Sequence, residues 1–205
     1  MTKNIQMNEQ EILAEFHAAE AILSGHFILS SGRHSPTYLQ CARVLMDPAR
    51  ADRLCKALAA KLAKTIDISK IDLVVAPAMG GVVVGYEMAR QLGKPSIFCE
   101  RDQGKFVFRR GFEVPAGAKV LVVEDVVTTG LSSKETFATI EAAGGTVIAE
   151  CSLIDRSNGT ANLGMPYVSL LTLDVPSYLP EAIPQELQKI PAIKPGSRWL
   201  QEKTE

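Results

Sequence analysis

The chain has 205 residues, 22 of them Lys or Arg and 23 Asp or Glu, which gives a formal net charge of -1. A chain of this length is expected to form one sizeable hydrophobic core with a small appendage. The nearly balanced charge argues against nucleic-acid partners, which bind basic surfaces. No apolar run reaches the roughly 18 residues that span a bilayer, so no membrane partner is expected.

Four cysteines lie far apart in the sequence and form no CxxC pair: Cys41, Cys55, Cys99 and Cys151. Their spacing does not match that of a zinc site. Residues 1–16 also lack the apolar region of a secretory signal. We therefore expect a cytoplasmic protein with four reduced thiols.

The N-terminal part of the chain contains a predicted helix and a less regular segment. Residues 8–24 place apolar side chains at helical spacing, which predicts a helix with one buried face that Gly25 ends. Residues 27–39 are strand-like or irregular, because Gly32 and Pro36 interrupt them.

The middle of the chain alternates strands and helices. Asp47 is a candidate helix cap, and Pro48 suits the first helical position. Apolar runs then predict buried strands, with helical stretches between them: strand 72–76, helix 82–91, strand 96–100, strand 119–125, helix 131–143, strand 146–155 and strand 167–175. This succession predicts an α/β fold with a mostly parallel sheet and helices on both faces.

Ligands on such sheets bind beyond the carboxyl ends of the strands. We therefore expect residues 77–81 (PAMGG), residues 124–130 (EDVVTTG) and the loop after Asp155 to lie along one edge. The proline-rich tail is expected to hold one short helix near residues 181–189. No internal repeat or low-complexity linker divides the chain, so residues 1–205 are predicted to form a single domain.

The strongest chemical signal is in residues 120–133 (VLVVEDVVTTGLSS). An apolar strand delivers Glu124 and Asp125 to its end, and carboxylates there accept hydrogen bonds from vicinal sugar hydroxyls. Two threonines and Gly130 then precede a helix, whose N-terminus suits a phosphate group. This order predicts a cradle for the ribose and phosphate of a phosphorylated sugar. The alternative is a buried strand whose acids only cap the following turn.

This segment resembles the signature with which type I phosphoribosyltransferases bind 5-phosphoribosyl 1-pyrophosphate (PRPP). The resemblance implies their fold, a mostly parallel central sheet flanked by helices, with a small N-terminal hood. The hood would comprise residues from about 1 to 45 and part of the C-terminal segment. The core would comprise residues from about 46 to 175. It also implies that Glu124 and Asp125 hold the ribose, with Asp125 catalytic, and that further residues bind PRPP: Val126, Val127, Thr128, Thr129, Gly130, Leu131 and Ser132.

Two more segments resemble orotate phosphoribosyltransferases. Residues 27–38 match the pattern F-x-L-x-S-G-x-x-S-P-x-Y, and residues 152–159 (SLIDRSNG) contain an Asp-Arg pair. The arginine of that pair, Arg156, can give the orotate carboxylate charge-assisted hydrogen bonds. The implied orotate-binding residues are Ser30, Ser31, Gly32, Arg33, Tyr38, Thr128 and Arg156. Two alternatives stay open, since Tyr38 can equally be a core residue and Arg33 can serve a surface salt bridge.

Basic residues also gather between positions 101 and 112, where interleaved apolar residues predict a two-stranded excursion. The resemblance implies a mobile loop that closes over pyrophosphate, often in the neighbouring subunit, with Arg101 and Lys105 as catalytic, PRPP-binding residues. Ser30, Gly80 and Asp102 stand where the better-known enteric pattern has lysines, which puts those lysine roles in doubt here. Backbone N–H groups at the start of the helix after PAMGG are expected to do part of that work.

Taken together, the resemblance implies transfer of the phosphoribosyl group from PRPP to orotate in pyrimidine biosynthesis, by a homodimer. Mg²⁺ is the implied cofactor, held mainly by substrate and water, so no protein metal ligands are expected. A purine-type phosphoribosyltransferase is one alternative, although such an enzyme should lack a segment like residues 30–38 (SSGRHSPTY) and an arginine like Arg156. A PRPP-sensing regulator of nucleic acid is another, although it should carry a basic face.

Overall fold

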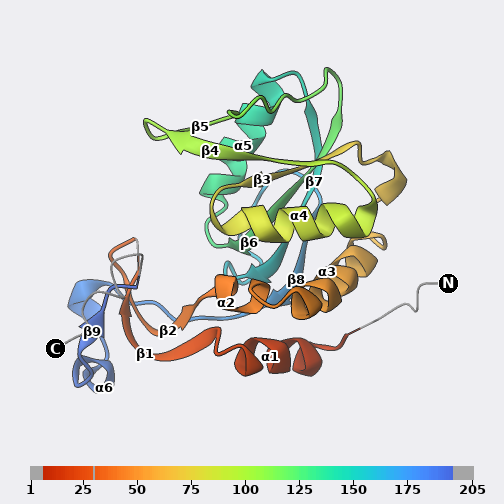
Figure 1. Ribbon diagram of the computed structural model, residues 1–205. Coiled ribbons are helices and arrows are strands. Elements are labelled where there is room, and N and C mark those ends of the chain that lie inside the picture. Colours follow the sequence, from red (N-terminus) through yellow and green to blue (C-terminus); the bar gives the residue numbers. More distant parts are fainter. Residues whose placement is uncertain (1–6, 30, 196–205) are drawn as a thin grey trace.

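The computed structural model describes residues 7–29 and 31–195, which form a six-stranded and a three-stranded sheet with helices around them (Figure 1). The elements in chain order are α1 (Glu9–Ala18), β1 (Ile22–Ile28), β2 (His34–Leu39), α2 (Cys41–Leu45), α3 (Pro48–Leu62), the 3₁₀ turn η1 (Ile68–Lys70), β3 (Leu73–Pro77), α4 (Gly80–Leu92), β4 (Ser96–Asp102), β5 (Lys105–Val107), β6 (Lys119–Val127), α5 (Leu131–Ala142), β7 (Thr146–Asp155), β8 (Tyr167–Thr172), the 3₁₀ turn η2 (Pro180–Ala182), α6 (Gln185–Gln188) and β9 (Ala192–Ile193).

The six-stranded sheet has the order β5-β4-β3-β6-β7-β8, and its pairs are parallel except for the β4–β5 hairpin. All five residues of β3 are buried, because α3 and α4 cover one face of the sheet and α5 the other (Figure 1). Residues of α1, α3 and α4 share the larger apolar cluster, while Phe137 and Ile140 of α5 belong to the second. The predicted α/β fold with a mostly parallel sheet is confirmed.

The carboxyl ends of the central strands meet at one edge of the sheet. Val127, the last residue of β6, pairs with Asp155, the last residue of β7. On the other side of β6, strand β3 ends at Pro77, directly before the turn into α4. The three loops predicted to share an edge do so.

The predicted helix over residues 8–24 is wrong in its second half. Asn8 caps α1 with a capping box, but the helix ends at Ala18. Glu20 takes a positive φ of 48°, which helical backbone excludes, and the chain then enters β1. Ile22 and Leu23 pair with residues of β2, so tertiary strand pairing overrides the helical spacing of the apolar side chains.

The three-stranded sheet joins the two ends of the described chain. Its order is β2-β1-β9, with β1 antiparallel to β2 and parallel to β9. The buried ring of His26 reinforces this contact, since its Nδ1 lies 2.9 Å from the Ile190 carbonyl oxygen and its Nε2 lies 2.6 Å from His34 Nδ1. Instead of one helix, the tail contains η2 and the four-residue α6.

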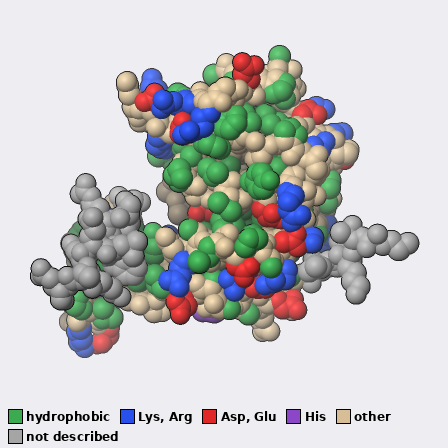
Figure 2. All heavy atoms as spheres, viewed as in Figure 1, with side chains coloured by type: hydrophobic (Ala, Val, Ile, Leu, Met, Phe, Trp, Pro, Cys, Tyr) green, Lys and Arg blue, Asp and Glu red, His purple; other side chains and the backbone are tan. Residues whose placement is uncertain are grey.

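Hydrophobic side chains gather on the face of the molecule that includes α4 (Figure 2). Met79, Val83 and Tyr86 are 83%, 49% and 67% exposed and recur at helical spacing on one face. We call these three residues the α4 patch. Among residues 7–29 and 31–195, no helix is long and apolar enough to cross a membrane, and the four cysteines are free and buried.

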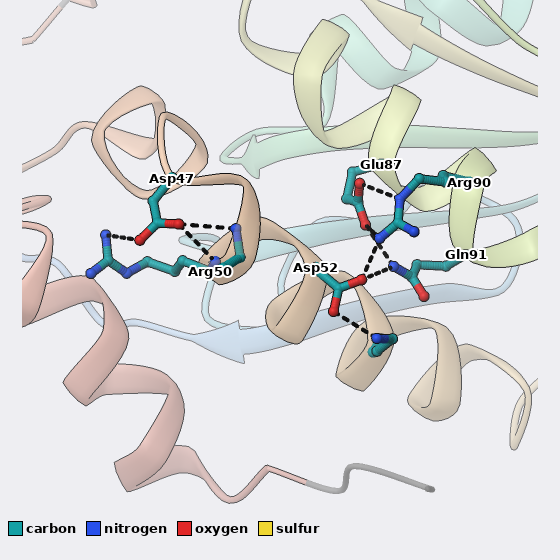
Figure 3. Close-up of polar contacts among 8 residues, drawn as sticks. Asp47, Arg50, Asp52, Glu87, Arg90 and Gln91 are labelled. Atoms are coloured by element: carbon teal, nitrogen blue, oxygen red, sulfur yellow. Dashed lines mark hydrogen bonds and ion pairs between the residues drawn. The ribbon is translucent and has the colours of Figure 1, made fainter. Parts of the chain in front are cut away.

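A polar network joins α3 to α4 beside this surface (Figure 3). Asp52 of α3 accepts hydrogen bonds from Lys56 Nζ at 2.6 Å and from Gln91 Nε2 at 3.0 Å, and it also pairs with Arg90. These partners, Lys56 foremost, hold the pKa of Asp52 at about 2, below the 3.8 of a free side chain. The carboxylate therefore ties two helices together in its charged form.

We expect Asp52→Asn to lower the free energy of unfolding by at most about 1 kcal/mol at neutral pH, since its partners are partly exposed. The depressed pKa means that this contribution is present above about pH 4 and is lost as the pH falls towards 2. Urea denaturation of both proteins at pH 7 and pH 2.5 measures the difference. Glu186→Gln, which removes an exposed pair with Lys189, is the matched control and should change little. An equal difference at both pH values would contradict the role of the charge.

Candidate active site

A cavity of about 730 Å³ lies where the small sheet faces the carboxyl edge of the large one. Four separate segments line it: the β1–β2 hairpin, the loop from β6 to α5, the loop after β7, and the C-terminal segment. Its lining residues include Ser31, Arg33, Tyr38, Thr128, Thr129, Arg156, Ser157, Thr160, Ser177 and Lys194. The sequence predicted that the first three of these segments contribute to the site.

The predicted phosphate cradle forms the start of α5. Thr128 and Thr129 line the cavity, and Gly130 precedes the helix with a φ of 75°. This positive φ favours glycine, and a Cβ there would also lie 2.5 Å from a methyl carbon of Leu163, which would have to move. The first-turn N–H groups of α5 have no intrahelical acceptors, which is the arrangement that binds phosphate. That Val126–Ser132 bind PRPP stays a prediction.

The acidic pair at the end of β6 divides between the two faces of the sheet. Glu124 is buried on the α5 side and accepts a hydrogen bond from Ser133 Oγ at 2.8 Å. Asp125 lies on the α4 side, against the first residue of that helix. Burial raises the pKa of both carboxyl groups, that of Glu124 to about 7. Neither acid lines the cavity, so that Glu124 and Asp125 hold the ribose stays a prediction.

Gly80 makes room for Asp125. A Cβ built on Gly80 would lie 2.6 Å from both Asp125 carboxylate oxygens, inside the contact distance of the two atoms. With this placement of Asp125, a residue bearing a side chain would displace the carboxylate. The close approach of Gly80 to Asp125 could not be predicted from the sequence.

The predicted orotate-binding residues fall largely around the cavity. Ser31, Arg33, Tyr38, Thr128 and Arg156 line it, whereas Gly32 is in the adjoining turn with a φ of 78°. Ser30 lies outside the described residues. The alternative that Tyr38 is only a core residue is disfavoured, since its side chain is half-buried and borders the cavity.

Arg156 is the cation best placed for a carboxylate. Its Nε is buried without a hydrogen-bond partner in the described part of the chain, and burial lowers the pKa of its guanidinium. A buried donor without a partner is costly, and a bound carboxylate would satisfy it. Arg33 differs, because its guanidinium donates to the Ser177 hydroxyl at 2.8 Å and to the Ser177 carbonyl at 2.5 Å. It joins the C-terminal segment to the hairpin and forms no salt bridge with any residue that the structure describes.

The basic loop forms the predicted two-stranded excursion, but away from the cavity. Arg101 of β4 pairs with Glu135 of α5, donates to the Gly104 carbonyl at 2.8 Å and stacks on Phe106 at 4.2 Å. Lys105 is exposed at the start of β5. Neither side chain lines the cavity, so their catalytic and PRPP-binding roles stay predictions.

Sequence reasoning missed several residues of the site. Ser157 and Thr160 lie one and four residues after Arg156, and Asp155 accepts a hydrogen bond from the Ser157 N–H at 2.7 Å in the same loop. Their position next to Arg156 was a usable signal. Lys194, which follows β9, also lines the cavity, and nothing in the local sequence marks it. Within the described ranges, no group of three or more His, Cys, Asp or Glu side chains is arranged to hold a metal ion.

Comparison with known proteins identifies the family. The sequence model of the phosphoribosyl transferase domain family matches residues 45–178 of this chain. The orotate phosphoribosyltransferase of Rhizorhabdus wittichii is 59% identical over 94% of this chain and 97% of its own. That of Caulobacter vibrioides is 51% identical over 95% and 99%.

The solved structures agree with this assignment. The orotate phosphoribosyltransferase from Aeropyrum pernix superposes with a TM-score of 0.65 and 28% identity, over 79% of this chain and 93% of that one. The Mycobacterium tuberculosis enzyme in complex with inorganic phosphate shares the fold, with a TM-score of 0.62 and 23% identity, over 79% and 95%. The chain therefore belongs to the orotate phosphoribosyltransferase family, within the type I phosphoribosyltransferases.

Proposed function

We propose that the protein transfers the 5-phosphoribosyl group of PRPP to orotate, giving orotidine 5-phosphate and pyrophosphate on the route to UMP. One observation supports this function best. A single cavity is lined both by the predicted phosphate cradle, at Thr128 and Thr129, and by the half-buried Arg156. A phosphorylated sugar and a carboxylate-bearing base can therefore bind side by side in it.

In the proposed reaction, orotate N1 displaces pyrophosphate from C1 of the ribose through an oxocarbenium-like transition state. The α5 N-terminus fixes the 5-phosphate, and Arg156 fixes the orotate carboxylate. Glu124 and Asp125 accept hydrogen bonds from the ribose hydroxyls, and their negative charge favours the developing sugar cation. The chain itself then acts mainly by positioning two substrates for in-line attack.

We propose that PRPP binds as its Mg²⁺ complex. Magnesium favours phosphate, hydroxyl and water oxygens over an all-protein cage, and the described residues form no such cage. When bound, the ion offsets the charge of the leaving pyrophosphate. The N–H groups at the start of α4, where Gly80 lies against Asp125, are proposed to bind pyrophosphate oxygens.

We further propose a homodimer in which the β4–β5 hairpin serves the neighbouring site. The α4 patch supports this assembly, because large exposed apolar side chains that recur on one helix face are typical of interfaces (Figure 2). The hairpin supports it as well, since Arg101 and Lys105 do not line the cavity of their own chain. The four free cysteines suit a reducing, cytoplasmic compartment.

Tyr86→Glu is expected to convert the dimer to a monomer, because it places a charge within the α4 patch. Light scattering after gel filtration measures the mass of the variant and of the parent protein. Leu179→Glu, at an exposed apolar residue outside the patch, should leave the dimer intact. A monomeric parent protein, or a dimeric Tyr86→Glu variant, would contradict this interface.

Lys194→Ala is expected to raise the KM for orotate about three- to tenfold. Lys194 lines the cavity from the C-terminal segment, and an exposed cation contributes up to about 1 kcal/mol to the binding of an anion. Steady-state kinetics with each substrate varied in turn measure the effect, with Lys64→Ala as a control on a distant surface. An unchanged KM for both substrates would remove Lys194 from the site.

The decisive test of the function mixes the protein with PRPP, Mg²⁺ and orotate and follows the loss of orotate absorbance. Turnover with orotate supports the proposal. Turnover with adenine, hypoxanthine or uracil, but not with orotate, would replace it by a phosphoribosyltransferase for another base. PRPP binding without any turnover would favour a PRPP-sensing regulator.

A further inference from the structure

A third carboxyl group lies behind the acidic pair, and the proposed reaction does not use it. Glu150 of β7 is fully buried, at 0% exposure. It pairs in register with Val122 of β6, two residues before Glu124, so both glutamates point to the α5 face of the sheet. A buried strand position of this kind normally carries an apolar side chain, because a carboxyl group there loses its hydration.

Ser133 joins the two glutamates. Its Oγ lies 2.8 Å from Glu124 Oε1 and 2.9 Å from Glu150 Oε1, and it is itself buried. A hydroxyl carries one hydrogen and can donate to only one of two carboxylates. The second contact is a hydrogen bond only if the other carboxyl group is protonated and donates to Ser133.

The surroundings decide which group carries that proton. The second oxygen of Glu150 has no partner among the described residues, and the nearby Tyr167 hydroxyl is engaged with Ser152 Oγ at 2.7 Å. Burial, helped by the neighbouring Glu124 charge, raises the pKa of Glu150 to about 9, above the value of about 7 for Glu124. Glu150 is thus the neutral acid and Glu124 the carboxylate.

We propose that Glu150 is a positioning residue for PRPP binding: its acid proton is donated to Ser133, and the Ser133 hydroxyl proton is donated to Glu124. This inference rests on the proposed role of Glu124 in holding the ribose. The chain of two hydrogen bonds fixes the Glu124 rotamer and assigns it one negative charge. Because Ser133 belongs to the first turn of α5, the same bonds also lock the phosphate cradle to the ribose subsite.

The test compares Glu150→Gln, Glu150→Leu and Ser133→Ala. The Gln side chain keeps a donor towards Ser133, so the KM for PRPP should stay within about twofold of the parent value. Glu150→Leu and Ser133→Ala should each raise the KM for PRPP about tenfold and leave the KM for orotate unchanged. The double variant should be no worse than either single one, since both break the same chain.

Thermal unfolding separates this role from a structural one. Replacing a buried acid by leucine should not lower the unfolding temperature, although it weakens PRPP binding. Calorimetric titration with PRPP and Mg²⁺ gives the affinity without turnover, so a parent protein that fails to use orotate would count against the function alone. An unchanged PRPP affinity in Glu150→Leu, or an equal loss in Glu150→Gln, overturns the proposal. Should Glu150→Leu not fold, Ser133→Ala and Glu150→Gln still decide it.

Discussion

Replacing Arg156 by alanine is expected to raise the KM for orotate about 10- to 100-fold while the KM for PRPP changes by less than about threefold. Arg156 lines the cavity, and its Nε has no hydrogen-bond partner among the described residues. Hydrogen bonds between charged groups contribute about 1.5–3 kcal/mol, which corresponds to this range. Steady-state kinetics with both substrates varied measure the two constants separately.

Two further variants sharpen this prediction. Arg156→Lys keeps the charge but loses the planar fork that matches a carboxylate, so it should fall between the parent and the alanine variant. Arg43→Ala removes an exposed arginine that pairs with Glu20 outside the cavity, and it should behave as the parent. If Arg156→Ala raised the KM for PRPP instead, the guanidinium would bind phosphate rather than the base.

The parts of the site that the sequence predicted are local in the chain. The cradle from Glu124 to Ser132 is one continuous segment, so strand, acids, hydroxyls and helix start can be read without knowing the fold. The buried strands were equally accessible, because parallel strands covered on both faces are unbroken apolar runs. Their shared edge follows from the rule that loops beyond carboxyl ends form the site in such sheets.

What the sequence did not reveal depends on contacts between distant segments. Ile22 and Leu23 continue a helical pattern, yet they pair with β2, and no local signal favours the strand. Lys194 reaches the cavity because β9 adds to β1, a pairing across most of the chain. The role of Glu150 has no local signal in its strand, because its partner Ser133 belongs to α5.

The division of the acidic pair between two faces of the sheet gives the final prediction. Asp125→Asn should lower kcat at least tenfold without changing the fold, because an amide keeps the shape but removes the negative charge that favours the sugar cation. Circular dichroism and thermal unfolding check the fold, and orotate turnover measures kcat. Asp72→Asn, at an exposed acid that accepts from the Lys119 N–H at the opposite edge of the sheet, is the matched control.

Gly80→Ala tests the Asp125 carboxylate by changing the residue that lies against it. The added methyl group would lie 2.6 Å from both oxygens of Asp125 if nothing moved, so the carboxylate has to change its position. We expect a loss of turnover that approaches that of Asp125→Asn, and little additional loss when the two substitutions are combined, because both act on one group. Parental kinetics in Asp125→Asn would mean that this acid does not act on the ribose. A full additive loss in the double variant would mean that Gly80 serves the pyrophosphate through its backbone, independently of Asp125.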